Sequence, residues 1–275
     1  SGGDPEPLTV PSGESGTSGH FFPQFLPSHR RVLFTIWNGS EWGTAILSLD
    51  SDQWDEVAHG CAAARYLPTG HMICSEMKGI GAAGNLLVAP FRPEAAALAG
   101  SFVPVPGSEN LGEFDFSVSA NGILVYAAGA AGMDPTALVW VDREGRPGSP
   151  DGIVDGYLTP ALSPDGRQLA ATRIVEAGRE ELWRYGLETG TAARLSSESV
   201  VSNLPLWSPD GERIVFNSLQ SRPGLYWVSR DLGDTLSLLL PRRDHILVPG
   251  SFSAGGRILA YTELNPLTLG DIWML

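Results

Sequence analysis

Residues 160–172 read PALSPDGRQLAAT, residues 205–217 read PLWSPDGERIVFN, and residues 249–262 read PGSFSAGGRILAYT. These segments repeat one pattern every 45 residues: a Ser-Pro-Asp-Gly turn, or a relaxed form of it, followed by a short alternating apolar run. Proline presets φ in such a turn, Asp tolerates the bridge region and Gly takes positive φ, so the turn can join two antiparallel strands. The repeat therefore predicts stacked β-modules.

Three weaker copies come earlier in the chain. With them, six turns begin at residues 26, 67, 119, 163, 208 and 253. Each turn leads into an apolar run, a variable polar loop and a second apolar run, and most copies add a more polar fourth segment. Four short strands in each repeat of this length are typical of a propeller blade. The sequence therefore predicts an all-β, six-bladed β-propeller that forms a single domain over residues 1–275.

The ends of the chain suggest how the ring closes. The sixth copy stops at Leu275 after its third strand, and residues 5–10 (PEPLTV) have the form of an outer strand. We expect residues 5–10 to pair with the last blade, because this would cover an open sheet edge. The expected blades span residues 23–60, 61–109, 110–156, 157–202, 203–246, and 247–275 plus 5–10.

Charge and hydropathy argue against two features, a nucleic-acid partner and a membrane-spanning segment. The formal charge of −13 comes from 31 acidic and 18 basic residues, and nucleic-acid affinity depends mostly on neutralising phosphates. No apolar run approaches the ~18 residues that span a bilayer. We therefore expect no nucleic-acid partner and no direct transmembrane segment. The acidic residues are dispersed along the chain and are interpreted as a solvated surface.

The repeat resembles the TolB-like, WD-related β-propeller family. The chain also resembles the extracytoplasmic propeller region of some bacterial serine/threonine kinases, through residues 23–27 (PQFLP), 64–68 (ARYLP), 116–119 (FSVS) and 138–143 (LVWVDR). The first turn carries Ser28-His29 and the last carries Ala254-Gly255 where the pattern has other residues. The resemblance implies a location on the periplasmic or extracellular face, peripheral to the membrane.

The sequence contains no recognised catalytic or metal-binding motif. HExxH, GxSxG, Walker and CxxC patterns are missing, and the five histidines have no metal-ligand spacing. Residues 79–84 (GIGAAG) match GxGxxG, but no helix is expected after them, so we interpret them as a hairpin loop. The predicted innermost strands are mainly apolar or small, with Asp115 as their one acid. The sequence predicts no catalytic residue, no cofactor and no metal.

Cys61 and Cys74 fall in one predicted hairpin, whose turn lies at residues 67–70. Cys61 is expected to be a diagonal neighbour of Cys74, which leaves two alternatives: a disulfide, or two small buried side chains. The second is the interpretation we favour from sequence.

The candidate partner-binding residues lie in variable loops between the second and third strands. Most tryptophans recur at a third-strand position and are expected to pack between blades, whereas Trp37 and Trp42 flank a polar loop and are expected to be exposed contacts. The loop 127–136, with Met133 and Asp134, lies on the same predicted face.

From these observations, the sequence predicts a non-catalytic scaffold, namely an extracytoplasmic subunit that docks on a membrane protein complex. The alternatives are the ligand-sensing domain of a receptor kinase and a propeller hydrolase or lactonase. A small ligand or peptide bound in the central channel, with the same loops, is a further alternative.

Overall fold

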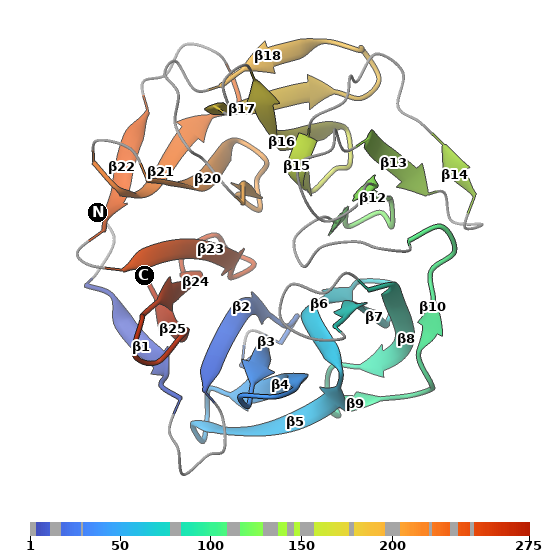
Figure 1. The fold of residues 1–275 in the computed structure, drawn as a ribbon, viewed down its shortest axis with the longest axis vertical. Helices are drawn as coiled ribbons and strands as arrows, with labels where there is room; N and C mark the ends of the chain where they lie inside the picture. The colour runs from blue at the N-terminus through green and yellow to red at the C-terminus, as the bar shows by residue number, and fades with distance from the viewer. Residues whose placement is uncertain are drawn as a thin grey trace. The chain divides into compact units, whose positions relative to one another are not determined.

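The computed structural model is built from strands joined by turns, and its described residues contain no helix (Figure 1). By its internal contacts the chain divides into two compact units, Ser1–Val105 with Leu247–Leu275, and Pro106–Ile246. The residues that the structure describes are 4–11, 18–28, 30–77, 84–108, 116–128, 137–141, 146–148, 157–175, 179–195, 204–219, 222–231, 236–242 and 245–275.

The first unit contains three antiparallel sheets, each formed mainly by strands that follow one another in the chain. Their strands are β2 (Gly19–Phe25), β3 (Arg31–Trp37), β4 (Trp42–Ser48) and β5 (Gln53–His59); β6 (Cys61–Leu67), β7 (His71–Glu76), β8 (Leu86–Arg92), β9 (Ala97–Leu98) and β10 (Val103–Pro104); and β1 (Glu6–Thr9), β23 (Ile246–Phe252), β24 (Leu259–Leu264) and β25 (Asp271–Met274). In the second of these sheets, β9 and β10 both pair with β8.

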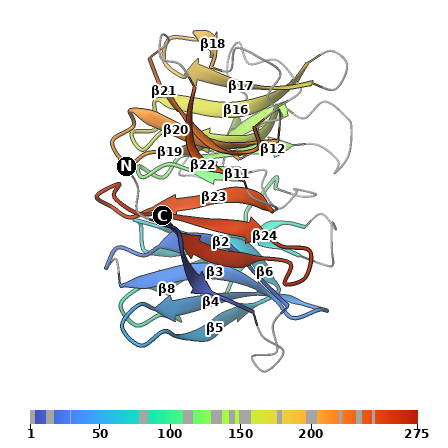
Figure 2. The ribbon, with the colours of Figure 1, turned by 90° about the vertical axis from the view of Figure 1, so that its left-hand side faces the viewer.

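The N-terminal strand completes the last sheet, as predicted. β1 pairs antiparallel with β25 through Glu6 opposite Met274, Pro7 opposite Trp273 and Thr9 opposite Ile272. The sheet order is β1-β25-β24-β23, and Figures 1 and 2 show the blue β1 beside the red β25. Leu8 packs in the same core cluster as Ile272. The prediction that both chain ends share one sheet is confirmed.

The second unit contains three more antiparallel sheets, each with its four strands in chain order. Their strands are β11 (Phe116–Val118), β12 (Leu124–Ala128), β13 (Ala137–Val141) and β14 (Pro147–Gly148); β15 (Tyr157–Leu162), β16 (Gln168–Val175), β17 (Arg179–Gly186) and β18 (Ala192–Arg194); and β19 (Leu206–Trp207), β20 (Arg213–Ser218), β21 (Gly224–Ser229) and β22 (Ser237–Pro241). The single-domain assignment and the blade limits inferred from sequence stay predictions.

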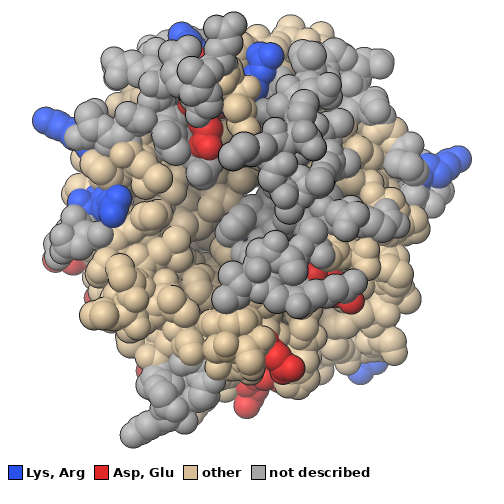
Figure 3. Space-filling model, in the orientation of Figure 1, with Lys and Arg blue, Asp and Glu red and all other residues tan. Residues whose placement is uncertain are grey.

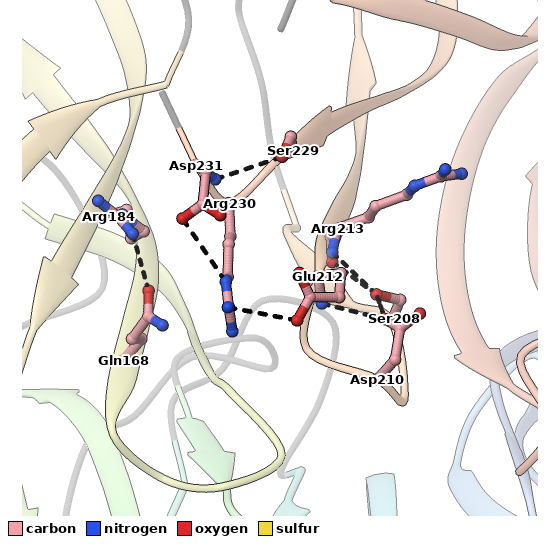
Figure 4. A network of polar contacts seen from close by, with 9 residues as sticks. All are labelled: Gln168, Arg184, Ser208, Asp210, Glu212, Arg213, Ser229, Arg230 and Asp231. Carbon is pink, nitrogen blue, oxygen red and sulfur yellow. Dashed lines mark hydrogen bonds and ion pairs between the residues drawn. The ribbon is translucent and has the colours of Figure 1, made fainter. Parts of the chain in front are cut away.

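The repeated turns form as their chemistry requires. In one copy, the Ser208 hydroxyl donates to Asp210 Oδ1 at 2.5 Å and accepts the Arg213 amide at 3.0 Å (Figure 4). The Gly211 amide donates to the Ser208 carbonyl. Gly211 takes the positive φ of 70° that the turn needs. The bond from Ser208 lowers the pKa of Asp210, followed in effect by the bond from the Glu212 amide. Asp210 is thus a turn residue, as interpreted from sequence.

Buried hydroxyls join neighbouring sheets within the first unit. The Phe22 amide donates to Thr262 Oγ1 at 3.1 Å, and the Ala63 amide donates to Thr35 Oγ1 at 2.9 Å. Phe22 and Ala63 both have positive φ and sit where the register of the first strand shifts, so their amides leave the strand ladder. Each amide is satisfied by a threonine hydroxyl of a neighbouring sheet, from β24 for Phe22 and from β3 for Ala63. The sequence patterns did not predict this role of Thr35 and Thr262, which end the segments 33–35 (LFT) and 260–262 (AYT).

Candidate functional site

A pair of packed tryptophans lines one side of the candidate site. Trp37, at the end of β3, lies directly opposite Trp42, at the start of β4, with ring centroids 4.8 Å apart and planes inclined at 45°. The turn between them is held by Asn38, whose side-chain oxygen accepts the amides of Ser40 and Glu41 at 2.9 and 2.8 Å. The hairpin therefore fixes the position of both indoles.

Phe21 extends this pair into a row of three rings. Its ring centroid lies 5.6 Å from that of Trp42. Space for Phe21 comes from two glycines: a Cβ on Gly19 would lie 2.6 Å from the Phe21 ring, and a Cβ on Gly270 would lie 2.5 Å from it. The sequence needs glycine at both positions because Phe21 fills the place of a side chain.

The loop between β24 and β25 forms the facing wall. The Asn265 amide donates to the Leu269 carbonyl at 3.2 Å, and the Leu267 amide donates to Asn265 Oδ1 at 2.9 Å. Thr268 Oγ1 donates to Asp271 Oδ2 at 2.8 Å. These bonds hold a compact loop with the Leu267 side chain 91% exposed.

The three rings and this loop border an open pocket of about 410 Å³. Asn265 supplies the one polar side chain of its wall. The lining residues are Phe21, Trp37, Trp42, Leu264, Asn265, Pro266 and Leu269. Because every lining residue belongs to the first unit, the pocket lies wholly within that unit.

The predicted site residues have different outcomes. Trp37 and Trp42 lie together, but their side chains are only 6% and 9% exposed, so they form pocket walls where the sequence predicted exposed contacts. The tilted packing of each ring on its neighbour explains this burial. Met133, Asp134, Asp115 and most of the GxGxxG segment lie outside the described residues. Their predicted roles stay predictions.

The surroundings of the pocket are acidic. Residues 18–25, 35–48 and 259–275, which carry its lining, contain no Lys or Arg but include Glu41, Glu263 and Asp271. Glu41 adjoins Trp42 in the hairpin turn and is exposed. On the face drawn in Figure 3, the charged residues that the structure describes are scattered among uncharged ones. The acidic character is confined to these lining segments, because Arg31 begins β3 and the Arg65 guanidinium of β6 donates to the Phe22 carbonyl at 3.4 Å.

His20 lies beside the pocket and joins three elements. Its Nδ1 is 2.9 Å from the Thr9 hydroxyl oxygen, its amide donates to the Gly270 carbonyl at 2.8 Å, and its ring packs edge-on to Phe34 and Trp54. Burial lowers the pKa of His20 to about 4. The imidazole is therefore neutral at neutral pH, and its contacts are those of a structural residue.

Glu180 is a half-buried carboxyl of the second unit with a raised pKa. Burial raises the pKa of Glu180, and its Oε2 is buried without a hydrogen-bond partner among the described residues. The adjacent Glu181 is instead bound by Arg194 and by the indole of Trp183, each at 3.0 Å. Within the described ranges, no three His, Cys, Asp or Glu residues gather as metal ligands. The prediction that the chain is not an enzyme stays a prediction.

Cys61 and Cys74 form a disulfide, which corrects the alternative that we favoured from sequence. Their Cα atoms lie 5.6 Å apart on the neighbouring strands β6 and β7. Cys61 pairs with Glu76 and Ala62 with Ser75, so Cys61 is the diagonal neighbour of Cys74 that the sequence predicted. Both cysteines are also buried in the core cluster of this sheet.

Comparison with known proteins identifies the fold. No family model matches the chain. A segment of 57 residues, 21% of this chain, is 35% identical to the Tol-Pal system protein TolB of Alcanivorax borkumensis, and it spans 13% of that protein. A solved structure of putative TolB from Agrobacterium tumefaciens matches 81% of this chain and 80% of its own at a TM-score of 0.64, with 17% identity.

The chain has a TolB-like β-propeller fold. The six antiparallel sheets of the described residues are its six blades, so the predicted fold class and family resemblance are confirmed. The likeness to kinase propellers stays a prediction. No helix among the described residues is long and apolar enough to cross a membrane.

The prediction of a non-catalytic scaffold is wrong, because the fold on which it was based is also found in enzymes. A putative gluconolactonase matches 98% of this chain and 90% of its own at a TM-score of 0.65 and 16% identity. A luciferin-regenerating enzyme matches 98% and 95% at a TM-score of 0.62 and 13% identity. Enzymes therefore share the fold with TolB. The repeat motif specifies turns and strands, whereas chemistry resides in loops that vary on the same scaffold.

Proposed function

We propose that this chain is a binding protein that holds an apolar group of its ligand in the pocket between Trp37, Trp42 and the 265–270 loop. One observation carries the proposal: an open pocket of about 410 Å³ is lined by three aromatic rings and three aliphatic side chains. Pockets of this size with a mainly apolar lining are typical of small-molecule sites.

The rigidity of the walls supports the proposal. Both loops of the pocket are fixed by their own hydrogen bonds, through Asn38 on one side and Asn265 on the other. A ligand therefore loses little free energy in ordering the site. Burial of a group of leucine size contributes about 2 kcal/mol to binding, and Asn265 offers one polar contact for orientation.

Saturation-transfer NMR with indole, toluene and 3,3-dimethylbutan-1-ol tests the proposal. We expect transfer to at least one probe, and its loss in Leu264→Glu, which places a charge in the pocket wall. Trp227→Leu is the matched control, because Trp227 lies in β21 of the other unit and does not line the pocket. Silence of all three probes, or equal signals in Leu264→Glu, would contradict the proposal.

We also propose an extracytoplasmic location, on the periplasmic or extracellular face. The Cys61–Cys74 disulfide supports it, because structural disulfides persist in oxidising compartments. Thiol alkylation of the protein in intact native cells tests it: both cysteines should be protected until a reductant is added. Two alkylated thiols without reductant would place the chain in a reducing compartment.

A protein partner, part of a membrane assembly, is a separate proposal that makes no statement about catalysis. The short match to the Tol-Pal system protein TolB supports it. Site-specific cross-linking from Ser40, which lies in the exposed hairpin turn, should trap one membrane protein in native cells. Cross-links from Ser40 no more frequent than from an exposed position such as Asp52, which lies in a turn at the other end of β4, would contradict it.

A further inference from the structure

Resting on the proposed function, the inference concerns the chemistry of the group that enters the pocket. We infer that this group is a quaternary ammonium cation, with the trimethylammonium group as its smallest natural form. The inference combines three properties of the wall: its aromatic rings, its scarcity of side-chain hydrogen-bond acceptors and the charges of the segments that line it.

The aromatic rings favour a cation over a purely aliphatic group. Trp37, Trp42 and Phe21 form one continuous row, with successive ring centroids 4.8 and 5.6 Å apart. A cation within about 6 Å of an aromatic face is attracted by the ring quadrupole, and tryptophan attracts it most strongly. Two of the three rings in this wall are indoles.

The shortage of hydrogen-bond acceptors decides which cation fits. Asn265 is the one lining side chain with a hydrogen-bond acceptor, and its oxygen already accepts the Leu267 amide, whereas the indoles of Trp37 and Trp42 can only donate. A primary ammonium brings three N–H donors and a guanidinium brings five, and donors left unsatisfied inside a pocket cost affinity. A quaternary ammonium has no N–H donor, and its charge is covered by methyl groups that suit leucine, proline and aromatic surfaces. The pocket therefore discriminates against lysine-like and arginine-like groups.

The charge of the lining segments favours a positive ligand over a neutral or negative one, although the partly buried Arg65 guanidinium donates to the Phe22 carbonyl beside them. The segments that form the pocket carry Glu41, Glu263 and Asp271 and no Lys or Arg in their described residues. Clefts surrounded by one sign of charge concentrate ligands of the opposite sign. An anion of the same shape is repelled, and a neutral isostere gains nothing from the field.

Titration with four probes of similar size tests the inference: choline, the neutral isostere 3,3-dimethylbutan-1-ol, the anion 3,3-dimethylbutanoate, and ethanolamine. We expect choline to bind roughly 2- to 30-fold more tightly than its neutral isostere, the anion to bind more weakly than both, and ethanolamine not to saturate. Neutral isostere binding as tight as choline, or ethanolamine binding as tight as choline, would overturn the inference while the proposed function stands. Absence of binding by all four probes would overturn the inference, and it would defeat the proposed function as well only if indole and toluene also failed to bind.

Two variants separate the cation effect from apolar burial. Phe21→Leu keeps an apolar wall but removes one ring, so choline affinity should fall while the neutral isostere is retained. Glu41→Gln removes one exposed charge, and choline affinity at low salt should fall about twofold with no change for the neutral isostere. Parallel losses for both probes in Phe21→Leu would show that the ring acts only by its area and would overturn the inference.

Vesicles distinguish the two sources of this chemistry, a free molecule and a lipid headgroup. The protein is sedimented with phosphatidylcholine vesicles and with phosphatidylglycerol vesicles, in the presence and absence of choline. Choline-competed binding to phosphatidylcholine alone assigns the headgroup, and failure to sediment despite choline binding in solution assigns a free ligand. Equal sedimentation with both vesicles, unaffected by choline, would contradict the inference for membranes.

Discussion

The imidazole of His20 and the hydroxyl of Thr9 are joined by a hydrogen bond of 2.9 Å between Nδ1 and Oγ1, and this bond ties β1 to β2. β1 also pairs with β25. The N-terminal strand is therefore held by a strand ladder on one side and by a buried histidine on the other. His20 is 1% exposed, so the same residue makes this attachment sensitive to acid.

We expect the folded protein to lose stability as the pH falls from 6.5 toward 4. The folded pKa of His20, about 4, lies below its ordinary value of 6.5, so the unfolded chain binds the additional proton between these two values. The stability contributed by neutral His20 is complete above pH 6.5 and is lost as the pH falls through the folded pKa, by about 3 kcal/mol in total. Urea unfolding of the native chain and of His20→Gln at pH 7.5, 5.5 and 4.5 measures it. Identical pH slopes in the two proteins would exclude His20 as the cause.

Removal of residues 1–10 should destabilise the first unit. The truncation deletes the pairing of β1 with β25 and the burial of Leu8 in the core cluster of Phe25 and Phe34. Lost strand pairing and apolar burial together predict about 2–4 kcal/mol. Thermal unfolding of the truncated and complete chains checks this, with Thr9→Val expected to reproduce about 1 kcal/mol of the loss through the His20 bond. An unchanged melting temperature would show that β1 does not stabilise the sheet.

Thr35→Val should cost about 1–3 kcal/mol, because the buried Ala63 amide loses its acceptor while the shape of the side chain is kept. Thr35→Ser is the matched control, since it keeps the hydroxyl and loses only a methyl group. Chemical denaturation gives the free energy of unfolding for both. If Val were tolerated as well as Ser, the hydroxyl would have no role in joining the first two sheets.

Reduction of the Cys61–Cys74 disulfide should lower stability by about 3 kcal/mol, the value typical of a short closed loop. The bridge restricts the unfolded chain and packs in the core of its sheet. Thermal unfolding with and without dithiothreitol measures the change, and in Cys61→Ala/Cys74→Ala the reductant should have no effect. Equal melting temperatures with and without reductant in the native chain would contradict the prediction.

Local chemistry and repetition made part of this structure predictable from sequence. The turns at Ser163 and Ser208 could be read because proline, aspartate and glycine each specify the backbone by themselves. The last sheet could be read because its copy ends at Leu275 without an outer strand, and residues 5–10 had the matching form. Trp37 and Trp42 were found because they break the repeat.

The rest depends on contacts between distant parts of the chain. Phe21 and Leu269 share a pocket although 248 positions separate them (269 − 21), and no local pattern joins them. The hydroxyl of Thr262 accepts the Phe22 amide only because a register shift turns that amide away from its strand. The Ala63 amide is turned toward Thr35 by a similar shift in β6. Bulges of this kind have no clear signal in a single sequence.

Gly270→Ala should disturb the pocket and the N-terminal attachment together. A Cβ at this position would lie 2.5 Å from the Phe21 ring and 2.7 Å from the His20 carbonyl oxygen. The backbone oxygen cannot move without shifting β2, and movement of Phe21 changes the row of rings, so we expect a loss of about 1–3 kcal/mol in stability and at least a fivefold loss of probe affinity, about 1 kcal/mol. Gly255→Ala is the matched control, because a Cβ there meets nothing within 4 Å. Thermal unfolding and probe titration of both variants measure the two effects. Were Gly270→Ala to bind probes like Gly255→Ala despite a lower melting temperature, the position of Phe21 would not control the pocket, and the ligand would have to be held by the Trp37 and Trp42 wall alone.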